Sequence, residues 1–334
     1  MSLRAFLNDK YMLKKLITSV LSYMRRYKVY RILHHREALR KINILKMKSA
    51  CPGLVYIEST NCCNAKCIMC PHSEMARPKT VMDISLFKKI ADDAIAAGVK
   101  NIGLSFLGEP LLDKEIFEKV SYIKNRDKSI RVSFVTNAML LSETTAERLI
   151  SSGLDEVRIS IDAITKQTYE SIRVGLCYEK VVSNVKKMLE LKKEKNVLLP
   201  KVRLAFLEIG VNNNESRPFL KYWKHKADNV EIDFSRDWAG QKEFPDGRSP
   251  HLLNIVKENP CDLLWKEMTV QADGKVVLCC NDYEGRVVLG DLNNNDIKSV
   301  WNSELYNYYR KKHINKERDS VKLCDKCRKY SFWW

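Results

Sequence analysis

Three cysteines near residue 65 have a spacing that could do metal chemistry. Cys63, Cys67 and Cys70 form the pattern C-x3-C-x2-C shortly after an apolar run at Leu54–Ile57. A structural zinc site needs four ligands, and Cys62 would be a poor fourth because adjacent cysteines rarely both bind one small ion. An iron–sulfur cube takes one thiolate per iron. Three thiolates therefore leave one iron open to bind a reactant.

A second group of cysteines lies in the last quarter of the chain. Cys324 and Cys327 form a C-x2-C pair, and Cys261 and Cys279 precede them. Together they offer four thiolates, enough to close a zinc site or a second iron–sulfur cube. Cys280 is an alternative to Cys279, because the predicted hairpin does not determine which of the two side chains points toward the other cysteines. Ordinary small side chains are expected at Cys51, Cys62 and Cys177.

The elements that must position these cysteines alternate between strands and helices. Apolar runs rich in Val, Ile and Phe predict strands at Leu54–Ile57, Ile102–Phe106, Ile130–Val135, Val157–Ile161, Val202–Leu207 and Val230–Phe234. Amphipathic patterns between them predict helices at Ile84–Ala97, Lys114–Asn125, Thr144–Ser151, Tyr178–Glu194 and Glu215–His225. This alternation predicts an α/β fold with a parallel sheet, as an open doubly wound sheet or a barrel.

A polar group follows every predicted strand. In chain order these groups are Glu58, Gly108-Glu109-Pro110, Thr136-Asn137, Ser160 with Asp162, Glu208, and Arg236-Asp237. Any one of them is equally a helix cap or a turn. Parallel α/β proteins build their active sites where strands end, so six in succession beside a cysteine cluster predict a site. Arg236, Asp237 and Glu208 are the candidate catalytic residues at this edge.

The strand–helix alternation stops near residue 240, which predicts three regions. These are a basic helical extension (1–50), a core barrel (51–240) and a cysteine-rich module (241–334) that begins with a linker at Gln241–Pro250. The module has a predicted hairpin and two helices, at Met268–Gln271 with Lys275–Leu278, Asn295–Trp301 and Glu304–His313. A module of this size has little core of its own, so a metal staple is expected.

The order of the motifs resembles the radical S-adenosylmethionine (SAM) superfamily over about residues 54–237. The cysteine pattern follows the first strand, as in that family. Gly108-Glu109-Pro110 is similar to the GGEP element of the family, with Leu107 in place of the first glycine. Thr136-Asn137-Ala138 is similar to its TNG element, and Ser160-Ile161-Asp162-Ala163 to its SLDA element.

This resemblance implies a partial (β/α)6 barrel that uses a [4Fe–4S] cluster and SAM. Cys63, Cys67 and Cys70 would hold the cluster, and its fourth iron would bind the SAM amine and carboxylate. Reduction by one electron would release a 5′-deoxyadenosyl radical that abstracts a substrate hydrogen. The resemblance implies that Gly108 and Glu109 bind the SAM amine, that Ser160 binds the ribose or carboxylate, and that the Met69 backbone binds the adenine. Asn137 and Arg203 are further candidates, or ordinary polar residues at strand ends.

The tail resembles the SPASM/twitch auxiliary-cluster domain. A Cys, a hairpin with Asp273-Gly274-Lys275, a further Cys, a Trp-containing helix and a closing C-x2-C occur in that order. The full SPASM pattern holds more cysteines, so one auxiliary [4Fe–4S] cluster is implied here, on Cys261, Cys279, Cys324 and Cys327. This layout resembles single-auxiliary-cluster dehydrogenases that oxidise an alcohol on an aminoglycoside precursor. A zinc staple on the same thiolates is the alternative.

A fully thiolate-ligated auxiliary cluster has no open iron, so its expected role is to pass an electron. If it accepts one from the substrate, the net reaction is oxidation of an alcohol, on a carbohydrate-like or other small polar substrate. Epimerisation and ribosomal-peptide modification are alternatives, although residues 1–50 look too short and too charged for a peptide-docking module. A non-enzymatic iron–sulfur carrier and a zinc-stapled nucleic-acid binder are further alternatives. An external one-electron reductant, flavodoxin or ferredoxin, is expected.

The basic charge is concentrated at the N-terminus. The chain of 334 residues has a net charge of +17, and residues 1–50 hold 13 basic and 2 acidic side chains. Apolar residues at helical spacing between Leu13 and Tyr27 predict a basic amphipathic helix, which is either a contact for an anionic membrane or acidic partner or a helix packed on the barrel. Nucleic acid is disfavoured, because aromatic residues are sparse there. Without a signal peptide or a long apolar run, a cytoplasmic location is expected, with peripheral membrane contact as an addition.

Overall fold

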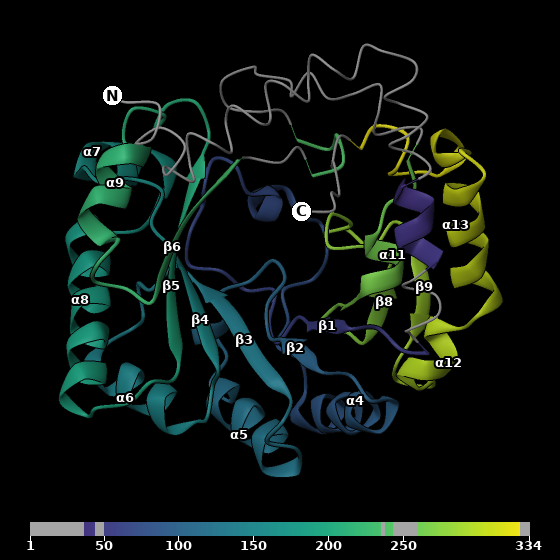
Figure 1. The fold of residues 1–334 in the computed structure, drawn as a ribbon, viewed down its shortest axis with the longest axis horizontal. Helices are drawn as coiled ribbons and strands as arrows, with labels where there is room; N and C mark the ends of the chain where they lie inside the picture. The colour runs from purple at the N-terminus through teal and green to yellow at the C-terminus, as the bar shows by residue number, and fades with distance from the viewer. Residues whose placement is uncertain (1–36, 44–49, 235–237, 243–258, 328–334) are drawn as a thin grey trace.

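The computed structural model describes residues 37–43, 50–234, 238–242 and 259–327. Six parallel strands pair in the order of the chain, so each βα unit places its strand beside the previous one (Figure 1). They are β1 (Leu54–Ile57), β2 (Asn101–Gly103), β3 (Arg131–Thr136), β4 (Glu156–Ser160), β5 (Lys201–Glu208) and β6 (Asn229–Phe234). The predicted α/β fold with a partial barrel is confirmed.

Helices cover the convex face of this sheet (Figure 1). They are α4 (Ile84–Ala97), α5 (Ile116–Arg126), α6 (Glu143–Ser151), α7 (Lys166–Ile172), α8 (Tyr178–Glu194) and α9 (Ser216–Trp223). The Asp83 carboxylate caps α4 by accepting from Ser85 N, and Gly98 ends it in the left-handed conformation. Helix α7 was not predicted, because seven residues are too few to show helical periodicity.

The two faces of the strands differ in polarity. Side chains that point toward the helices are fully buried and apolar, as Val157 and Ile159 are on β4. The alternating positions face the concave side and include polar residues, as Arg158 and Ser160 do on the same strand. The sequence suggested mostly apolar strands, but the open concave face keeps these polar positions partly exposed.

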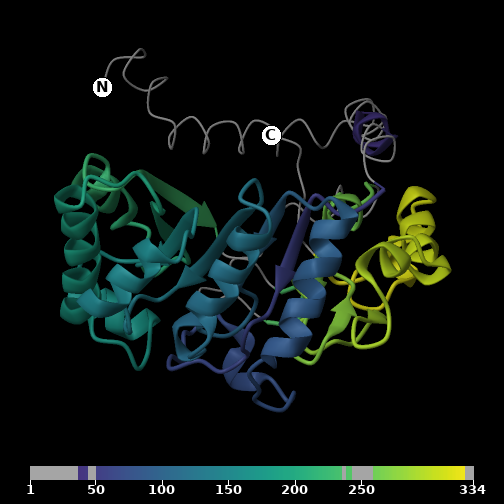
Figure 2. The same ribbon diagram turned by 90° about the horizontal axis from the view of Figure 1, so that it is seen from below.

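The tail continues the barrel sheet instead of forming a separate one. Strand β7 (Glu267–Val270) pairs in parallel with β1, and β8 (Lys275–Val277) and β9 (Val288–Asp291) add antiparallel strands at that edge. Figure 2 shows the tail at the end of the sheet opposite β6. The predicted hairpin is confirmed, whereas β9 was not predicted. Helical elements of the tail are α11 (Leu263–Lys266), α12 (Ile297–Trp301), α13 (Glu304–Ile314) and η3 (Arg318–Ser320).

Only a short part of the basic extension belongs to the described residues. Residues 37–43 form a helical segment in which Ala38 and Ile42 are buried, and Ile42 joins the main hydrophobic core. The predicted amphipathic helix between Leu13 and Tyr27 lies outside the described residues, as does most of the linker at Gln241–Pro250. Within the described part of the chain, no helix is long and apolar enough to cross a bilayer.

Candidate active site and second cysteine site

The first cysteine loop follows β1 and is fixed on both sides by hydrogen bonds. Asn61 N donates to Thr80 O (3.1 Å), and Thr80 N donates to the Asn61 side-chain oxygen (2.7 Å). Farther along the loop, Lys66 N donates to Val174 O (2.8 Å) in the segment after α7. Hydrogen bonds of the backbone and of the Asn61 side chain therefore hold the loop to its neighbouring segments.

Cys63, Cys67 and Cys70 are partly buried on this loop. Cys70 N donates to Cys67 O (3.0 Å), which makes a turn between the last two cysteines. Burial raises the pKa of the Cys63 thiol and raises that of Cys70 to about 12, although hydrogen bonds from the backbone of Ala65 and His72 offset part of the rise. Thiolates at such positions need cations beside them, which iron supplies. The Cys62 Sγ lies 4.0 Å from Thr80 O, at the flank of the loop.

Arg173, which the sequence analysis missed, brings a positive charge to this loop. Its Nη1 donates to Cys67 Sγ (3.6 Å), and its Nε donates to the buried Asp162 carboxylate (2.7 Å). Burial lowers the pKa of Arg173, but Asp162 and Cys67 raise it by more, so the guanidinium stays charged. The sequence gives one indirect signal, the glycine at position 175, two residues after Arg173. In the structure Gly175 has a φ of +93° and makes a turn after α7.

Gly108 allows the turn after β2 to approach the cysteine loop. A Cβ atom at this position would lie 2.1 Å from Thr60 O and 2.8 Å from Cys62 O, so a side chain does not fit. The next residue, Glu109, donates from its backbone N to Cys62 O (2.8 Å). Two sequence-predicted SAM-binding residues therefore touch the residue that precedes Cys63.

The Glu109 carboxylate is buried and is held by hydrogen bonds from the end of β3 and from its own turn. It accepts hydrogen bonds from Thr136 Oγ1 (2.6 Å), Asn137 N (2.8 Å) and Leu111 N (3.2 Å). Burial raises the pKa of Glu109, and these hydrogen bonds offset part of that rise. Asn137 Nδ2 also donates to Asn64 Oδ1 (2.8 Å), which links β3 to the cysteine loop. A buried carboxylate held in this way suits an ammonium group as its partner.

Two further predicted SAM-binding residues lie on the cysteine loop itself and at the end of β4. Met69 packs with Ile172 and Ile209, and its carbonyl oxygen accepts from Trp238 Nε1 (2.9 Å). Ser160 is the last residue of β4 and is partly buried.

One of the three candidate catalytic residues belongs to the described part of the chain. Glu208 is the last residue of β5, 6% exposed, and pairs in register with Phe234 at the end of β6. Arg236 and Asp237 lie outside the described residues. Glu208 is therefore the candidate base that the described part of the chain places at the edge where the strands end.

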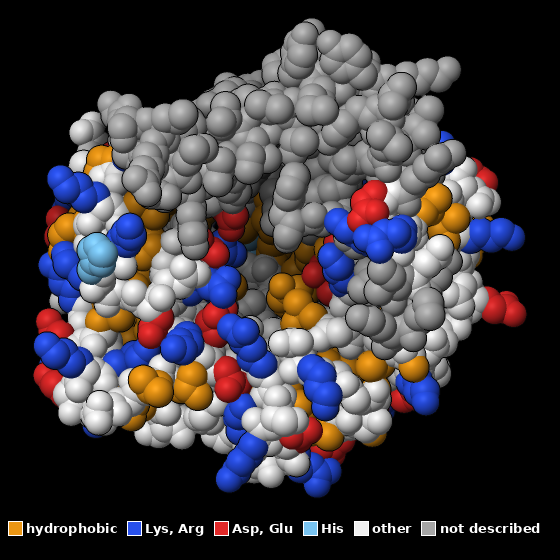
Figure 3. Space-filling model, viewed as in Figure 1, with side chains coloured by type: hydrophobic (Ala, Val, Ile, Leu, Met, Phe, Trp, Pro, Cys, Tyr) orange, Lys and Arg blue, Asp and Glu red, His pale blue; other side chains and the backbone are white. Residues whose placement is uncertain are grey.

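Arg203 belongs to a network of charges on the concave face. It contacts Glu156 (3.0 Å) and Glu231 (3.3 Å), while Arg158 contacts Glu231 and Asp233. These residues line a cavity of about 260 Å³. Figure 3 shows basic and acidic side chains side by side around the central hollow of this face. The guanidinium of Arg203 is engaged by two carboxylates, and the inner wall of the barrel is strongly polar.

The four cysteines predicted for the tail line one small cavity. Cys261, Cys324 and Cys327 are buried, and Cys279 completes the set. Cys280 does not line this cavity, so the structure brings Cys279 to the other three. Much of the remaining wall is apolar and comes from Ala239, Leu263, Leu264, Leu278 and Leu323. Four thiols around one cavity fit a closed metal or cluster site.

His313 reaches the same cavity from α13. Cys261 N donates to its Nδ1 (3.1 Å), while its Nε2 is buried and has no hydrogen-bond partner among the described residues. Burial, and secondarily Arg318, lowers the pKa of His313 to about 3. An orphaned N–H group costs stability unless an acceptor reaches it. A sulfur-rich group in the cavity would supply that acceptor, so the residues present fit a cluster.

Two family models match the chain. The Radical SAM superfamily model covers residues 57–202, and the SPASM model, an iron–sulfur cluster-binding domain, covers residues 261–328. Both matches include cysteines predicted as ligands. The first covers Cys63, Cys67 and Cys70, and the second begins at Cys261 and ends just after Cys327.

Curated relatives are similar over different shares of the chain. A probable GTP 3′,8-cyclase of Methanocaldococcus jannaschii is 34% identical over 171 residues, which is 50% of this chain and 53% of the relative. The chain thus spans about half the length of these archaeal cyclases. A tungsten-containing aldehyde ferredoxin oxidoreductase cofactor-modifying protein of Pyrococcus furiosus is 26% identical over 296 residues, which is 77% of this chain and 82% of the relative.

Solved structures with the same fold bind several kinds of molecule. BtrN in complex with AdoMet and 2-DOIA superposes with a TM-score of 0.58 at 18% identity, covering 84% of this chain and 94% of BtrN. Streptococcus suis SuiB bound to the precursor peptide SuiA gives a TM-score of 0.65 at 15% identity, covering 82% of this chain and 70% of SuiB. At these identities the likeness shows the fold alone.

Proposed function

This chain belongs to the radical SAM superfamily and carries a SPASM-type iron–sulfur domain, and from that premise we propose that it oxidises an alcohol carbon of a small, polar, carbohydrate-like substrate. Its cofactors are [4Fe–4S] clusters and SAM. When bound and reduced by one electron, the first cluster and SAM supply the chemistry that removes a hydrogen atom from an unactivated carbon.

We assign the first cluster to Cys63, Cys67 and Cys70. Their loop is fixed by backbone hydrogen bonds, and Cys62 lies at its flank, so three thiols are available and one iron is left for SAM. Arg173 adds a positive charge beside Cys67 that attracts a negatively charged group at this loop.

We assign the SAM amine to the edge formed by Gly108 and Glu109. The Glu109 carboxylate is held in place by β3 and keeps further acceptor capacity for an ammonium group. Ser160, Asn137 and the Met69 backbone are assigned to the same cofactor from neighbouring elements, with Arg203 as an outer candidate on the concave face.

The closed four-thiol cavity of the tail carries the assignment of an oxidation. Cys261, Cys279, Cys324 and Cys327 use every corner of a cube, so the site offers no open iron to a substrate. Such a site is suited to exchanging electrons. An enzyme with one radical site and one separate electron site can complete a net two-electron oxidation.

The proposed reaction balances with three acceptors. The alcohol loses three things: a hydrogen atom from carbon, a proton from oxygen and one further electron. The hydrogen atom is transferred to the SAM-derived fragment. A cluster held by the four thiols of the tail would be the acceptor for the electron. Glu208, buried at the end of β5, is our proposed acceptor for the proton, with Asp237 as the alternative after β6. Arg236 beside it is proposed as a hydrogen-bond donor to the substrate oxygen, because a guanidinium stays protonated.

The polar inner wall supports a hydrophilic substrate. Arg158, Arg203 and Asp233 line the cavity on the concave face, where charged groups offer several hydrogen bonds to hydroxyl groups. An apolar substrate would have to desolvate these charges without replacing their water. A polyhydroxylated compound replaces those hydrogen bonds.

We propose two kinds of partner besides this substrate. The first cluster needs an external one-electron donor, and the net charge of +17 favours an acidic donor protein such as a flavodoxin or ferredoxin. The basic residues 1–50 are a proposed contact for an anionic membrane surface or an acidic partner.

The test is an anaerobic assay of the full chain with reconstituted clusters, SAM and a chemical reductant. A panel of polyols, aminocyclitols, sugar nucleotides and short peptides is screened for substrate-dependent 5′-deoxyadenosine. The expected product is a ketone or aldehyde, and deuterium placed on the alcohol carbon should appear in 5′-deoxyadenosine. A product of unchanged mass with inverted stereochemistry, or turnover of peptides alone, would contradict alcohol oxidation.

A further inference from the structure

Two basic side chains are buried at the wall of the tail cavity. His313 on α13 is 1% exposed, and Arg318 on η3 is 2% exposed. The other residues of the wall are the four cysteines, apolar side chains and Asn281. The site therefore combines four thiols with a buried imidazole and a buried guanidinium.

The hydrogen bond to Nδ1 fixes the tautomer of His313. Cys261 N can only donate, so Nδ1 is the acceptor and the ring proton of the neutral imidazole lies on Nε2. That N–H finds no partner among the described residues. Burying an unsatisfied donor costs about 1–3 kcal/mol, a cost that sulfur atoms of a bound cluster would remove.

Arg318 adds a fixed positive charge to the same wall. Burial lowers its pKa, but the thiols of Cys261, Cys327 and Cys324 raise it by more, and its side chain hydrogen-bonds to Cys327. A guanidinium remains charged across the physiological range. This charge favours any state of the site that carries more negative charge.

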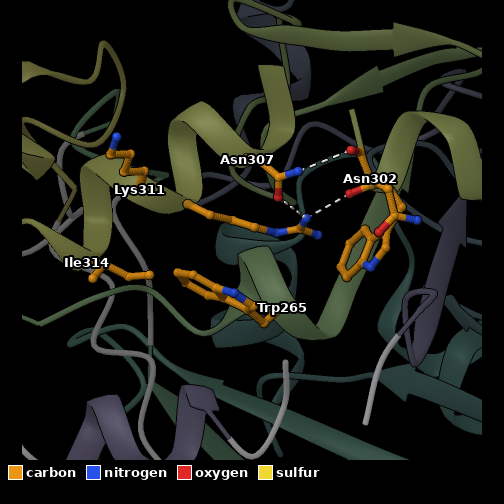
Figure 4. A pocket seen from close by; sticks show the side chains of 7 residues that line it. Trp265, Asn302, Asn307, Lys311 and Ile314 are labelled. Carbon is orange, nitrogen blue, oxygen red and sulfur yellow. Dashed lines mark hydrogen bonds between the residues drawn. The ribbon is translucent and has the colours of Figure 1, made fainter. Parts of the chain in front are cut away.

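The helix that carries His313 is anchored from outside the cavity. Arg310, three residues earlier on α13, donates from Nε to Leu264 O (2.9 Å) and from Nη1 to Trp301 O (2.7 Å). Figure 4 shows this junction, where Asn307 of α13 donates to the carbonyl oxygen of Asn302 (3.1 Å), the residue that follows α12. These bonds tie α13 to α11 and α12, so the position of His313 does not depend on the metal site alone.

We propose that His313 is a positioning residue that donates a hydrogen bond from Nε2 to a sulfur of the auxiliary cluster and, together with Arg318, raises the reduction potential of that cluster. Reduction adds one negative charge to the cluster, and both groups stabilise that charge. Hydrogen bonds to the sulfurs and local charge are known determinants of cluster potentials. The inference deepens the proposed function, and rests on it for the role of the cluster as electron acceptor.

A redox titration of the full chain with both clusters, followed by electron paramagnetic resonance, tests the inference. The auxiliary signal is the one retained by the full chain carrying Cys63→Ala. In His313→Leu, the ratio of reduced to oxidised auxiliary cluster at the wild-type midpoint should fall about tenfold, a shift of about 59 mV for one electron. Asn307→Ala is the matched control, because it removes an α13 hydrogen bond outside the cavity and should leave the potential unchanged.

A second measurement needs no variant and covers the case in which His313→Leu fails to assemble. Pulsed resonance on wild-type protein with isotopically labelled histidine should detect hyperfine coupling of one histidine nitrogen and one exchangeable proton to the reduced auxiliary cluster. Absence of that coupling, or an unchanged potential in His313→Leu, overturns the inference. Neither measurement uses a substrate, so alcohol oxidation can fail while the shift in potential stands. Zinc at the tail site would overturn both proposals.

Discussion

The two cysteine sites of this chain are built in opposite ways. Cys63, Cys67 and Cys70 lie on one short loop, whose shape is fixed by backbone hydrogen bonds to the segments around Thr80 and Val174. The tail site draws Cys261 and Cys279 from regions far from Cys324 and Cys327 along the chain. The first site is local and the second depends on the folding of a whole region.

This difference is matched by different surroundings. The loop is bordered by polar and charged groups, such as Glu109, Asn137 and Arg173. The tail site is enclosed by leucines and offers four thiols together with the buried imidazole of His313 and the buried guanidinium of Arg318. Ligand number and wall polarity together separate a site that binds a reactant from one that holds an electron.

The largest expected effect is on the loop. Replacing Cys63, Cys67 or Cys70 with Ala removes one of three ligands, so we expect reductive cleavage of SAM to fall to background. The measurement is 5′-deoxyadenosine formed under dithionite, together with iron content. Cys62→Ala is the matched control and should retain most of the activity, since its thiol lies at the flank of the loop. An inactive Cys62→Ala beside an active Cys63→Ala would reverse the ligand assignment.

The second effect separates the tail from the loop. A Cys324→Ala/Cys327→Ala variant should lose about four irons per chain and keep SAM cleavage, but it should not complete substrate oxidation. The physical reason is that the substrate would lose a hydrogen atom without an acceptor for the second electron. Cys280→Ala is the control, because Cys280 does not line the cavity. Full oxidation by the double variant, with the barrel still soluble and binding SAM, would contradict the electron-acceptor role.

Removal of iron by a chelator should affect the stability of the tail and of the barrel differently. Metal binding contributes to folding where ligands come from separate segments, so chelation should open the tail more than the barrel. Hydrogen exchange should speed up most in β8 and α13, less in β1, and least in β4 and β5. Strand β1 is intermediate because it loses its partner β7, as at Val55 and Met268, but keeps β2. Uniform protection across both regions would contradict this order.

The sequence analysis located both cysteine sites because thiol spacing and strand–helix alternation are local signals. It missed Arg173, because its role arises from long-range contacts with Asp162 and Cys67. It also missed the pairing of β7 with β1, since the parallel partner of a strand is set by the whole sheet. His313 stood in a predicted helix without a role, as the cavity it faces exists only after folding.

Removal of the positive charge of Arg173 beside the first cysteine loop should lower the free energy of unfolding by a moderate amount. Arg173→Met leaves the Asp162 carboxylate buried without its cation, which should destabilise the fold by about 3–5 kcal/mol. Arg173→Lys keeps the charge and should cost less, and Arg173→Met/Asp162→Asn should recover part of the loss. Denaturant unfolding of the iron-free chain measures all three. Equal stability of Arg173→Met and wild type would show that the pair contributes nothing net.

The smallest expected effect uses two helix caps of the same geometry, one in each region. Ser142 Oγ accepts from Thr145 N (3.2 Å) at the start of α6 in the barrel, and Ser303 Oγ accepts from Tyr306 N (3.2 Å) at the start of α13 in the tail. Each Ser→Ala change should cost about 1 kcal/mol. Because the costs are equal, any difference in their consequences reports on the regions and not on the caps.

In iron-free protein, Ser303→Ala should lower only the opening free energy of the tail amides, and Ser142→Ala only that of the barrel amides. Hydrogen exchange resolved by peptide measures both. If each change lowers both values equally, the regions unfold as one unit, and the cluster in the tail does not hold a separately unfolding part of the chain.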